Sequence, residues 1–197
     1  MKPTAVTDAR VRKTQSRLRD ALVSLIHEKH YDTIVVRDIL KRADVGRSAF
    51  YAHFANKHEL LTSGIEHILH GSPERQAPAK VGPFGTAVWF SLPFFEYVGR
   101  CRHTTQLKTS RKGRAVVHEH LRKLLVEQVE QEIRTTARSL KNAAPAIPPD
   151  LLAEHVVGTF ILVLNWWADT QSALSPREVD DLFLTLVSPV LAAAAQG

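Results

Sequence analysis

The sequence predicts an all-α protein, with a three-helix N-terminal head that carries a helix-turn-helix and a larger helical body behind it. Three observations support this class. Apolar side chains recur at helical spacing along most of the chain, no segment shows a convincing strand pattern, and residues 71–85 hold three prolines and three glycines, which no regular helix tolerates. We therefore expect a head over 10–70, a boundary loop at 71–85 and a body over 86–197.

The head is expected to begin with an amphipathic helix, since leucines recur among charged residues from 12 to 30. The next segment opens with three β-branched residues, which are typical of a strand, but its later apolar spacing favours a helix. Asn56 is a plausible N-cap for the last helix of the head, with Glu59 completing a reciprocal capping arrangement. The expected helices of the head cover residues 12–30, 36–43, 47–53 and 57–70, with the helix-turn-helix at about 35–54.

The body repeats the helical pattern in longer and more apolar segments. Ser91 and Pro93 mark a helix start, and a broad apolar stripe runs through the long segment from 115 to 142 until a proline-rich stretch interrupts it. No charged residue occurs between Glu154 and Asp169. Two final helices are expected over 150–172 and 176–195.

The net charge of +6 is concentrated in the head. Residues 1–60 hold twelve Lys and Arg against seven Asp and Glu, a net of +5, whereas the other 137 hold fourteen against thirteen, a net of +1. A nucleic-acid-binding head on a nearly neutral body has this asymmetry, because phosphate neutralisation supplies most non-specific affinity. A basic tail on an unrelated protein would give the same count.

Composition narrows the remaining classes of function. No cofactor, metal site or catalytic residue is expected, because the chain holds no Ser nucleophile elbow, zinc-protease or phosphate-loop motif, and its one cysteine, Cys101, forms no internal disulfide. We found no apolar run near the ~18 residues needed to cross a bilayer and no secretory signal, so we expect a cytoplasmic protein with no membrane partner.

The segment GRSAFYAHFANKHELL, from Gly46 to Leu61, has an inside and an outside. Phe50 and Phe54 lie four residues apart and so share one helix face, where they are expected to pack against Val45, Ile39 and Leu22. The opposite face carries small or polar groups and one ring, which suits entry into a major groove about 12 Å wide.

Each outward residue suggests a contact with DNA. Arg47 suits guanine or phosphate, Ala49 a thymine methyl, and Tyr51, His53 and Lys57 suit phosphate. The basic arm that contains Arg10, Arg12 and Lys13 suits the backbone or the minor groove. The candidate DNA-contacting residues are Arg12, Lys13, Arg37, Arg47, Ser48, Ala49, Tyr51, His53 and Lys57.

The stretch VVRDILKRADVGRSAFYAHFANKHELL resembles the DNA-binding head of TetR-family transcriptional repressors, and LNWWADTQSALSPREVDDLFLTLVSPVL is similar to the last two helices of one branch of that family. The resemblance implies a homodimer, an all-helical regulatory body and release of DNA when a small molecule binds. Two positions depart from the family pattern: Asp44 stands where Gly is usual in the turn, and Gly46 where Ser or Asn caps the next helix. Ala49 and Ala52 offer no polar group for hydrogen bonds to bases on the outward face of this helix, which we call the reading face.

Two further sets of residues are expected in the body. The last two helices are too apolar to be covered by one chain, so we expect them to pair with those of a second copy, with Gly158 and Ala153 allowing close approach; the candidate interface residues are Val156, Gly158, Leu162, Leu182, Leu186 and Val190. An excess of aromatic rings predicts an apolar pocket with a few polar anchors, among them Gln106. Its candidate lining residues are Phe94, Tyr97, His103, Phe160, Asn165 and Trp166.

Some alternatives stay open. Residues 100–123 have a net charge of +7 and suit an anionic effector, DNA phosphates or solvent alone. His118 and His120, or His67 and His70, are weak candidates for metal ligands, since surface histidines near helix ends are far commoner. The alternative function is a helical small-molecule-binding protein or an enzyme on a borrowed scaffold.

Overall fold

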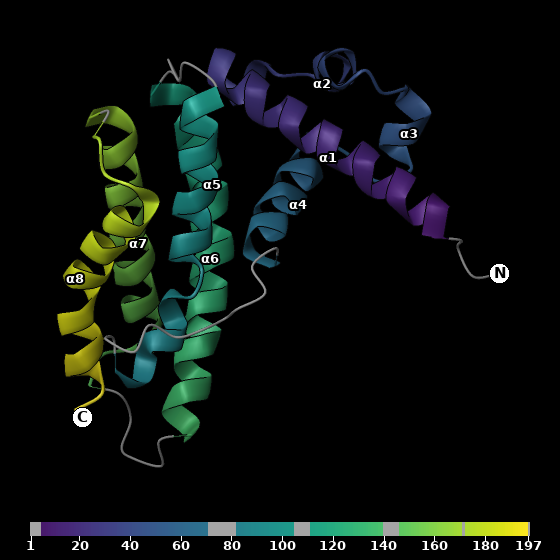
Figure 1. The fold of residues 1–197 in the computed structure, drawn as a ribbon. Coiled ribbons are helices and arrows are strands. Elements are labelled where there is room, and N and C mark those ends of the chain that lie inside the picture. The colour runs from purple at the N-terminus through teal and green to yellow at the C-terminus, as the bar shows by residue number, and fades with distance from the viewer. Residues whose placement is uncertain (1–4, 71–81, 105–110, 140–145, 171, 197) are drawn as a thin grey trace. The chain divides into compact units, whose positions relative to one another are not determined.

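The computed structural model describes residues 5–70, 82–104, 111–139, 146–170 and 172–196, apart from the side chains of 5–8, 27, 70, 101–104 and 111–114. All regular structure in these ranges is helical, which confirms the predicted class (Figure 1). The chain forms two compact units, Met1–His67 with Leu107–His120, and Ile68–Gln106 with Leu121–Gly197. The first turns of the long helix of the body thus group with the head. Most of the expected boundary loop, residues 71–81, lies outside the described residues.

The first unit contains the helix-turn-helix. Two of its helices have the expected bounds, but the first starts earlier, and the third ends two residues sooner. Its elements are α1 (Ala5–Glu28), the 3₁₀ turn η1 (Tyr31–Thr33), α2 (Val36–Ala43), α3 (Arg47–Tyr51) and α4 (Lys57–His70).

The small core of the head forms as the ring pattern predicts. Phe50, Phe54, Ile39 and Leu22 are all buried, and the rings of Phe50 and Phe54 lie 5.9 Å apart between centroids. Val45 is only half-buried. Burial of Phe50 from a helix of five residues fixes which side of α3 faces outward.

The start of α4 is capped nearly as expected. Asn56 Oδ1 accepts hydrogen bonds from the backbone N–H of His58 at 2.9 Å and of Glu59 at 3.0 Å. The carboxylate of Glu59 reaches back to the N–H of Ala55, at 2.6 Å, one residue before the cap. Three backbone donors near the helix start are thereby satisfied.

Lys57 corrects a prediction, because its ammonium group points into the head. Nζ donates to the carbonyl oxygens of Tyr31, Asp32 and Ile34, at 2.8, 3.2 and 2.9 Å, and lies 4.5 Å from the centre of the Tyr31 ring. These three bonds use all three N–H groups of the ammonium. Burial lowers the pKa of Lys57. Lys57 therefore ties the start of α4 to the turn that leads into α2.

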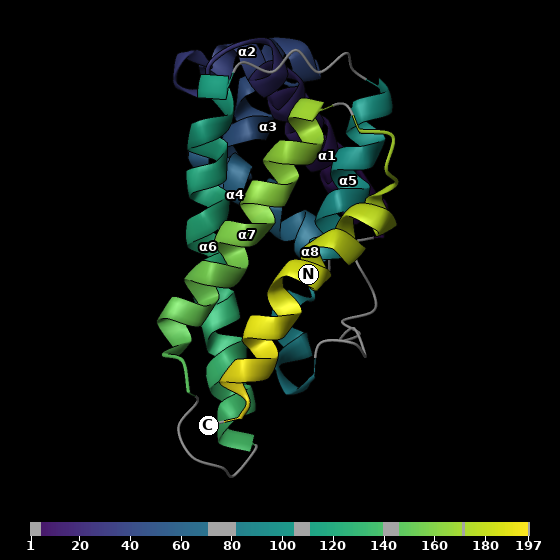
Figure 2. The same cartoon turned by 90° about the vertical axis from the view of Figure 1, so that its left-hand side faces the viewer.

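The second unit is a helical bundle. Its elements are η2 (Pro83–Val88), α5 (Ser91–Thr104), most of α6 (Arg111–Ser139), α7 (Pro149–Thr170) and α8 (Pro176–Ala194). Helices α7 and α8 lie side by side in both views (Figures 1 and 2). Ser175 and Glu178 form a reciprocal capping box at the start of α8. Gly99 allows α5 to approach α8, since a Cβ there would lie 2.7 Å from Pro176 Cγ.

Aromatic rings form the core of this unit. Phe160 lies at their centre, with ring centroids 5.0 Å from Phe90, 5.1 Å from Phe95, and 5.8 Å from both Phe94 and Phe183. Most of these pairs meet edge to face, the geometry that ring quadrupoles favour. The ring-rich segments of α5, α7 and α8 are therefore packed against one another.

Helix α7 has the length and the apolar composition of a membrane-crossing helix, with a mean hydropathy of 1.4 over its most apolar window. The expectation that no segment approaches this length was therefore wrong. Eight of its side chains are buried within its own unit, from Leu152 to Trp167. A core helix of a folded bundle has the same composition.

Asp180 on α8 is a buried carboxyl group, with 8% of the residue exposed. Its Oδ1 atom has no hydrogen-bond partner among the described residues. Burial raises the pKa of Asp180 to about 6, and the nearby charges of Asp181 and Glu96 add to this, while a hydrogen bond with Ser91 opposes it. The ionised form therefore destabilises the fold at neutral pH.

Asp180→Asn should raise the free energy of unfolding at pH 7.5 by about 1–2 kcal/mol, because the variant has no charge to bury. The native carboxyl binds its proton more tightly than the unfolded one, so its cost grows as the pH rises from about 4 to 6. Urea unfolding across this window measures the difference between the two proteins. A difference that stays constant with pH would contradict this account.

Candidate nucleic-acid interface

Helix α3 presents a short polar face around its buried anchor. Its start at Gly46 has extended backbone, and Phe50 has no exposed surface. Arg47, Ser48 and Tyr51 are exposed, as predicted, whereas Ala49 and His53 are half-buried. The reading face is therefore narrower than the sequence pattern indicates.

Tyr51 supports Arg47 on this face. The Tyr51 ring meets the buried Phe50 ring edge to face, at 5.2 Å between centroids. The guanidinium carbon of Arg47 lies 5.6 Å from the centre of the Tyr51 ring, within the range of a cation–π contact. The buried core thus positions the exposed ring, and that ring positions the cation.

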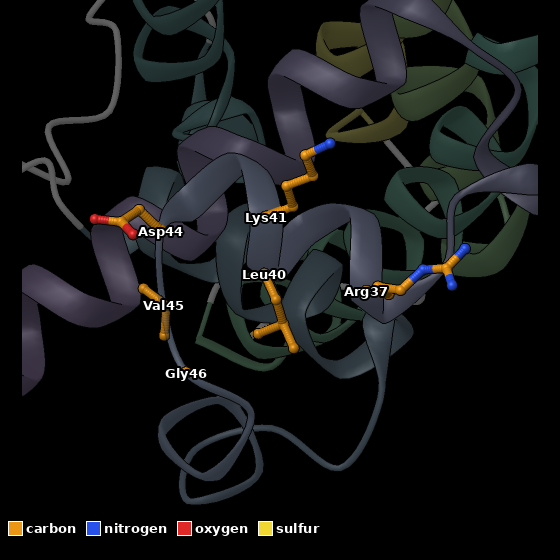
Figure 3. Close-up of a pocket in the computed structure, with 6 residues that line it drawn as sticks. All are labelled: Arg37, Leu40, Lys41, Asp44, Val45 and Gly46. Carbon is orange, nitrogen blue, oxygen red and sulfur yellow. The ribbon is translucent and has the colours of Figure 1, made fainter.

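An open depression of about 530 Å³ is lined by α2 and by the turn between α2 and α3 (Figure 3). Arg37 and Asp44 stand at opposite sides, with the side chain of Leu40 between them and Val45 next to Asp44. Lys41 lines it as well, although it was not among the predicted DNA-contacting residues. Its signal was the four-residue spacing from Arg37, which places both cations on one face of α2.

Two ion pairs hold α2 against the end of α1. Arg42 donates to both carboxylate oxygens of Glu28, at 2.7 and 2.6 Å, and Lys29 pairs with Asp38 at 2.5 Å. The hydrogen bond from Lys29 is the main reason that the pKa of Asp38 is lowered. Arg42 and Lys29 thus serve the packing of the head, while Arg37 and Lys41 remain on its surface.

The predicted arm residues lie on α1. Arg12 and Lys13 are exposed, as is Arg10. One turn after Lys13, Arg17 reaches across to the turn before α3 and pairs with Asp44 at 3.1 Å. Because Lys13 and Arg17 are four residues apart, the same face of α1 carries both cations toward this turn.

The predicted pocket residues do not all come together. Phe94 and Phe160 meet in the core, and Tyr97 and Asn165 are half-buried. Trp166 is 43% exposed, because six residues along a helix place it about 120° around α7 from the buried Phe160, so its assignment to an enclosed pocket with Phe160 was wrong. The side chain of His103 and all of Gln106 lie outside the described residues, as do most side chains of the basic segment 100–123.

The predicted interface residues divide in the same way. Leu162, Leu182 and Leu186 are 65%, 41% and 53% exposed, Gly158 is exposed and Val190 half-buried. Val156 and Ala153 were wrongly placed on this face, since both are fully buried within their own unit. Leu151 and Trp166 extend the exposed stripe of α7 and were missed, although helical spacing from Leu162 marks them.

Among the residues with described side chains, no group of three or more His, Cys, Asp or Glu could hold a metal ion. His120 stacks on His58, with ring centroids 5.3 Å apart, and His58 Nδ1 lies 3.1 Å from the Tyr31 hydroxyl. These contacts are part of the packing around Lys57.

Comparisons with known proteins agree with this geometry. Residues 18–63 match the family described as bacterial regulatory proteins, tetR family. Over 60 residues, 30% of this chain, the sequence is 38% identical to the uncharacterized HTH-type transcriptional regulator YxbF of Bacillus subtilis (strain 168), but the match spans only 16% of that protein.

A solved structure extends the likeness beyond the head. The TetR transcriptional regulator from Streptococcus agalactiae 2603V has a TM-score of 0.51 and 26% sequence identity, with 93% of this chain and 98% of that chain covered. The head motif, its geometry and these likenesses agree, and the head of this chain is the N-terminal domain found in bacterial regulatory proteins of the tetR family.

Proposed function

We propose that this protein is a cytoplasmic, homodimeric repressor that binds a pseudo-palindromic operator through α3 and leaves it when a small molecule binds the body. The observation that carries the proposal is the anchored polar face of α3, where buried Phe50 holds Tyr51 and Arg47 outward. The alternative of an enzyme loses its support, because the family consists of regulators.

On the surface around α3, some residues suit contacts with bases and others suit contacts with the DNA backbone. Arg47 and Ser48 are placed to meet base edges in the major groove, where Arg favours the O6 and N7 atoms of guanine. Tyr51 and His53 at the end of α3 suit phosphate. Further cations that suit the backbone on either side of the groove are Arg12, Lys13, Arg37 and Lys41.

Arg47→Ala should weaken binding to the operator by ~1–3 kcal/mol and relax preference at one position in each half-site, because one base contact is lost. The operator is first selected from fragments of the source genome, and affinities are then measured by gel retardation at fixed salt. If the variant binds the operator as tightly as the wild type and with the same preference, α3 does not read the bases.

Lys57→Met serves as the contrast within this experiment. It removes the donor for three backbone carbonyls without removing a surface charge from α3, so it should lower the free energy of unfolding by about 1–3 kcal/mol. Arg47→Ala should leave unfolding nearly unchanged, because its side chain is exposed. The two variants thus distinguish the loss of a base contact from the unfolding of the head.

The dimer is proposed from the exposed stripes of α7 and α8. Single exposed leucines are ordinary on protein surfaces, but Leu151, Leu162 and Trp166 lie on one face of α7, and Leu182 and Leu186 lie on one face of α8. Gly158 lies in the middle of the α7 stripe, and a side chain there would meet no described atom within 4 Å beyond the adjacent turns of its own helix. A second copy of the same two helices would cover both stripes in a four-helix interface.

Leu162→Glu should convert the dimer to monomer or aggregate, because the interface would then bury a charge without a partner. Analytical ultracentrifugation at micromolar concentration measures the change, and Leu151→Glu at the end of the stripe should have a weaker effect. A wild-type protein that sediments as a monomer under these conditions would exclude the proposed dimer.

An apolar or aromatic effector is proposed from the ring-rich core of the body. Phe94 and Phe160 are already in contact, so a ligand between them must separate the rings, with half-buried Tyr97 nearby on α5. Such a ligand lowers DNA affinity only by the difference between its affinities for the two conformations of the protein. Asn165 remains a candidate polar anchor.

The three tryptophans, Trp89, Trp166 and Trp167, all belong to the second unit. Intrinsic fluorescence should therefore respond to a bound effector and change little when operator DNA is added. Aromatic compounds are screened for both a fluorescence change and release of DNA in gel retardation. Release of DNA by a compound that leaves the fluorescence unchanged would argue against a site among these rings.

A further inference from the structure

Asp44 occupies an unfavourable place in the turn between α2 and α3. Its backbone is left-handed, with φ 50° and ψ 54°, a region that residues other than glycine seldom adopt. It also caps the C-terminus of α2, where the helix dipole disfavours a negative charge. Its side chain is 94% exposed and lies at the edge of the depression lined by Arg37 and Lys41 (Figure 3).

The partner of Asp44 is a cation from a different helix. Arg17 Nη2 of α1 lies 3.1 Å from Asp44 Oδ2, and 45% of the Arg17 side chain is exposed. Ion pairs at this exposure contribute little to stability, because solvent screens the two charges. The pair therefore occupies one cation and stabilises the fold little.

Other contacts already hold α1 against α2. The Arg42–Glu28 pair has two hydrogen bonds and a third to Ser24, and Lys29 pairs with the less exposed Asp38. These contacts are sufficient to fix the packing of the two helices. The main effect of the Arg17–Asp44 pair is therefore to reduce the positive charge of the surface that surrounds α3.

We propose that Asp44 weakens the attraction of this protein for DNA by placing a negative charge on the basic surface and by holding Arg17 away from phosphate. This inference rests on the proposed function. Each protein cation that neutralises a DNA phosphate releases counterions that were condensed on the DNA. A cation that is held by a carboxylate therefore adds less to the affinity and to its salt dependence. The protein then spends less time on unrelated DNA at a given salt concentration.

Asp44→Asn tests the proposal, because asparagine tolerates the left-handed backbone and has no charge. The probe is a random-sequence DNA duplex long enough for one dimer, so the operator need not be known. The variant should bind this duplex about threefold to tenfold more tightly at low salt, and the slope of log K against log salt should steepen by about 0.9 for one added phosphate contact.

Three further variants isolate the cause. Asp44→Gly removes the same charge and relieves the backbone, so agreement with Asp44→Asn assigns the effect to charge. Arg17→Ala should reduce affinity more in the Asp44→Asn background than in the wild type, because only there is Arg17 released. Glu66→Gln on α4 removes one negative charge from an exposed site outside the depression and should have a smaller effect.

The outcomes separate the two proposals. A wild-type protein that binds no duplex even at low salt overturns the proposed function. A wild-type protein that binds, with Asp44→Asn and Asp44→Gly that match its affinity and salt slope, overturns this inference alone. Equal effects of Asp44→Asn and Glu66→Gln would also overturn it, because net charge and not position would then be the cause. Thermal unfolding of each variant confirms that the head remains folded.

Discussion

The burial of Phe50 is the constraint on which the rest of the head depends. A helix of five residues has no stability of its own, because helix nucleation costs more than one turn returns. α3 exists because the ring of Phe50 is fully buried and packs against the ring of Phe54. The same burial determines which residues face outward, so the geometry of the reading face follows from a packing requirement.

Around Phe50, hydrogen bonds and ion pairs of polar side chains hold the helices of the head to one another. Lys57 satisfies three carbonyls at the end of η1, and the ion pairs of Arg42 and Lys29 hold α2 to α1. In the sequence these cations cannot be distinguished from the lysines and arginines of the surface. In the structure, however, they bind carbonyl and carboxylate groups of the head itself. The basic character of the segment therefore divides into an internal set that builds the head and an external set available to DNA.

The body shows a similar division between the two sides of its helices. On α7, Phe160 and Trp167 enter the ring core, while Leu162 and Trp166 face outward. Because α7 carries apolar residues on both sides, its composition also matches that of a membrane-crossing helix. Asp180 is a buried carboxyl group in the same unit, and its raised pKa reflects the cost of burying a carboxylate.

The sequence by itself determined the helical class, the bounds of α2 and α4 and the buried pair Phe50 and Phe54, because these depend on periodicity and capping within a few residues. The tertiary structure decided which way individual side chains of one type point. Lys57 turned inward because unpaired carbonyls from a distant turn needed donors, and Val156 and Ala153 turned to their own core because helix rotation is set by neighbouring helices. Trp166 left the predicted pocket for the same reason. Arg17 and Asp44 are 27 residues apart, and no local pattern marks their pairing. Contacts between distant segments select among side chains that local chemistry leaves equivalent, so only the fold assigns each one its place.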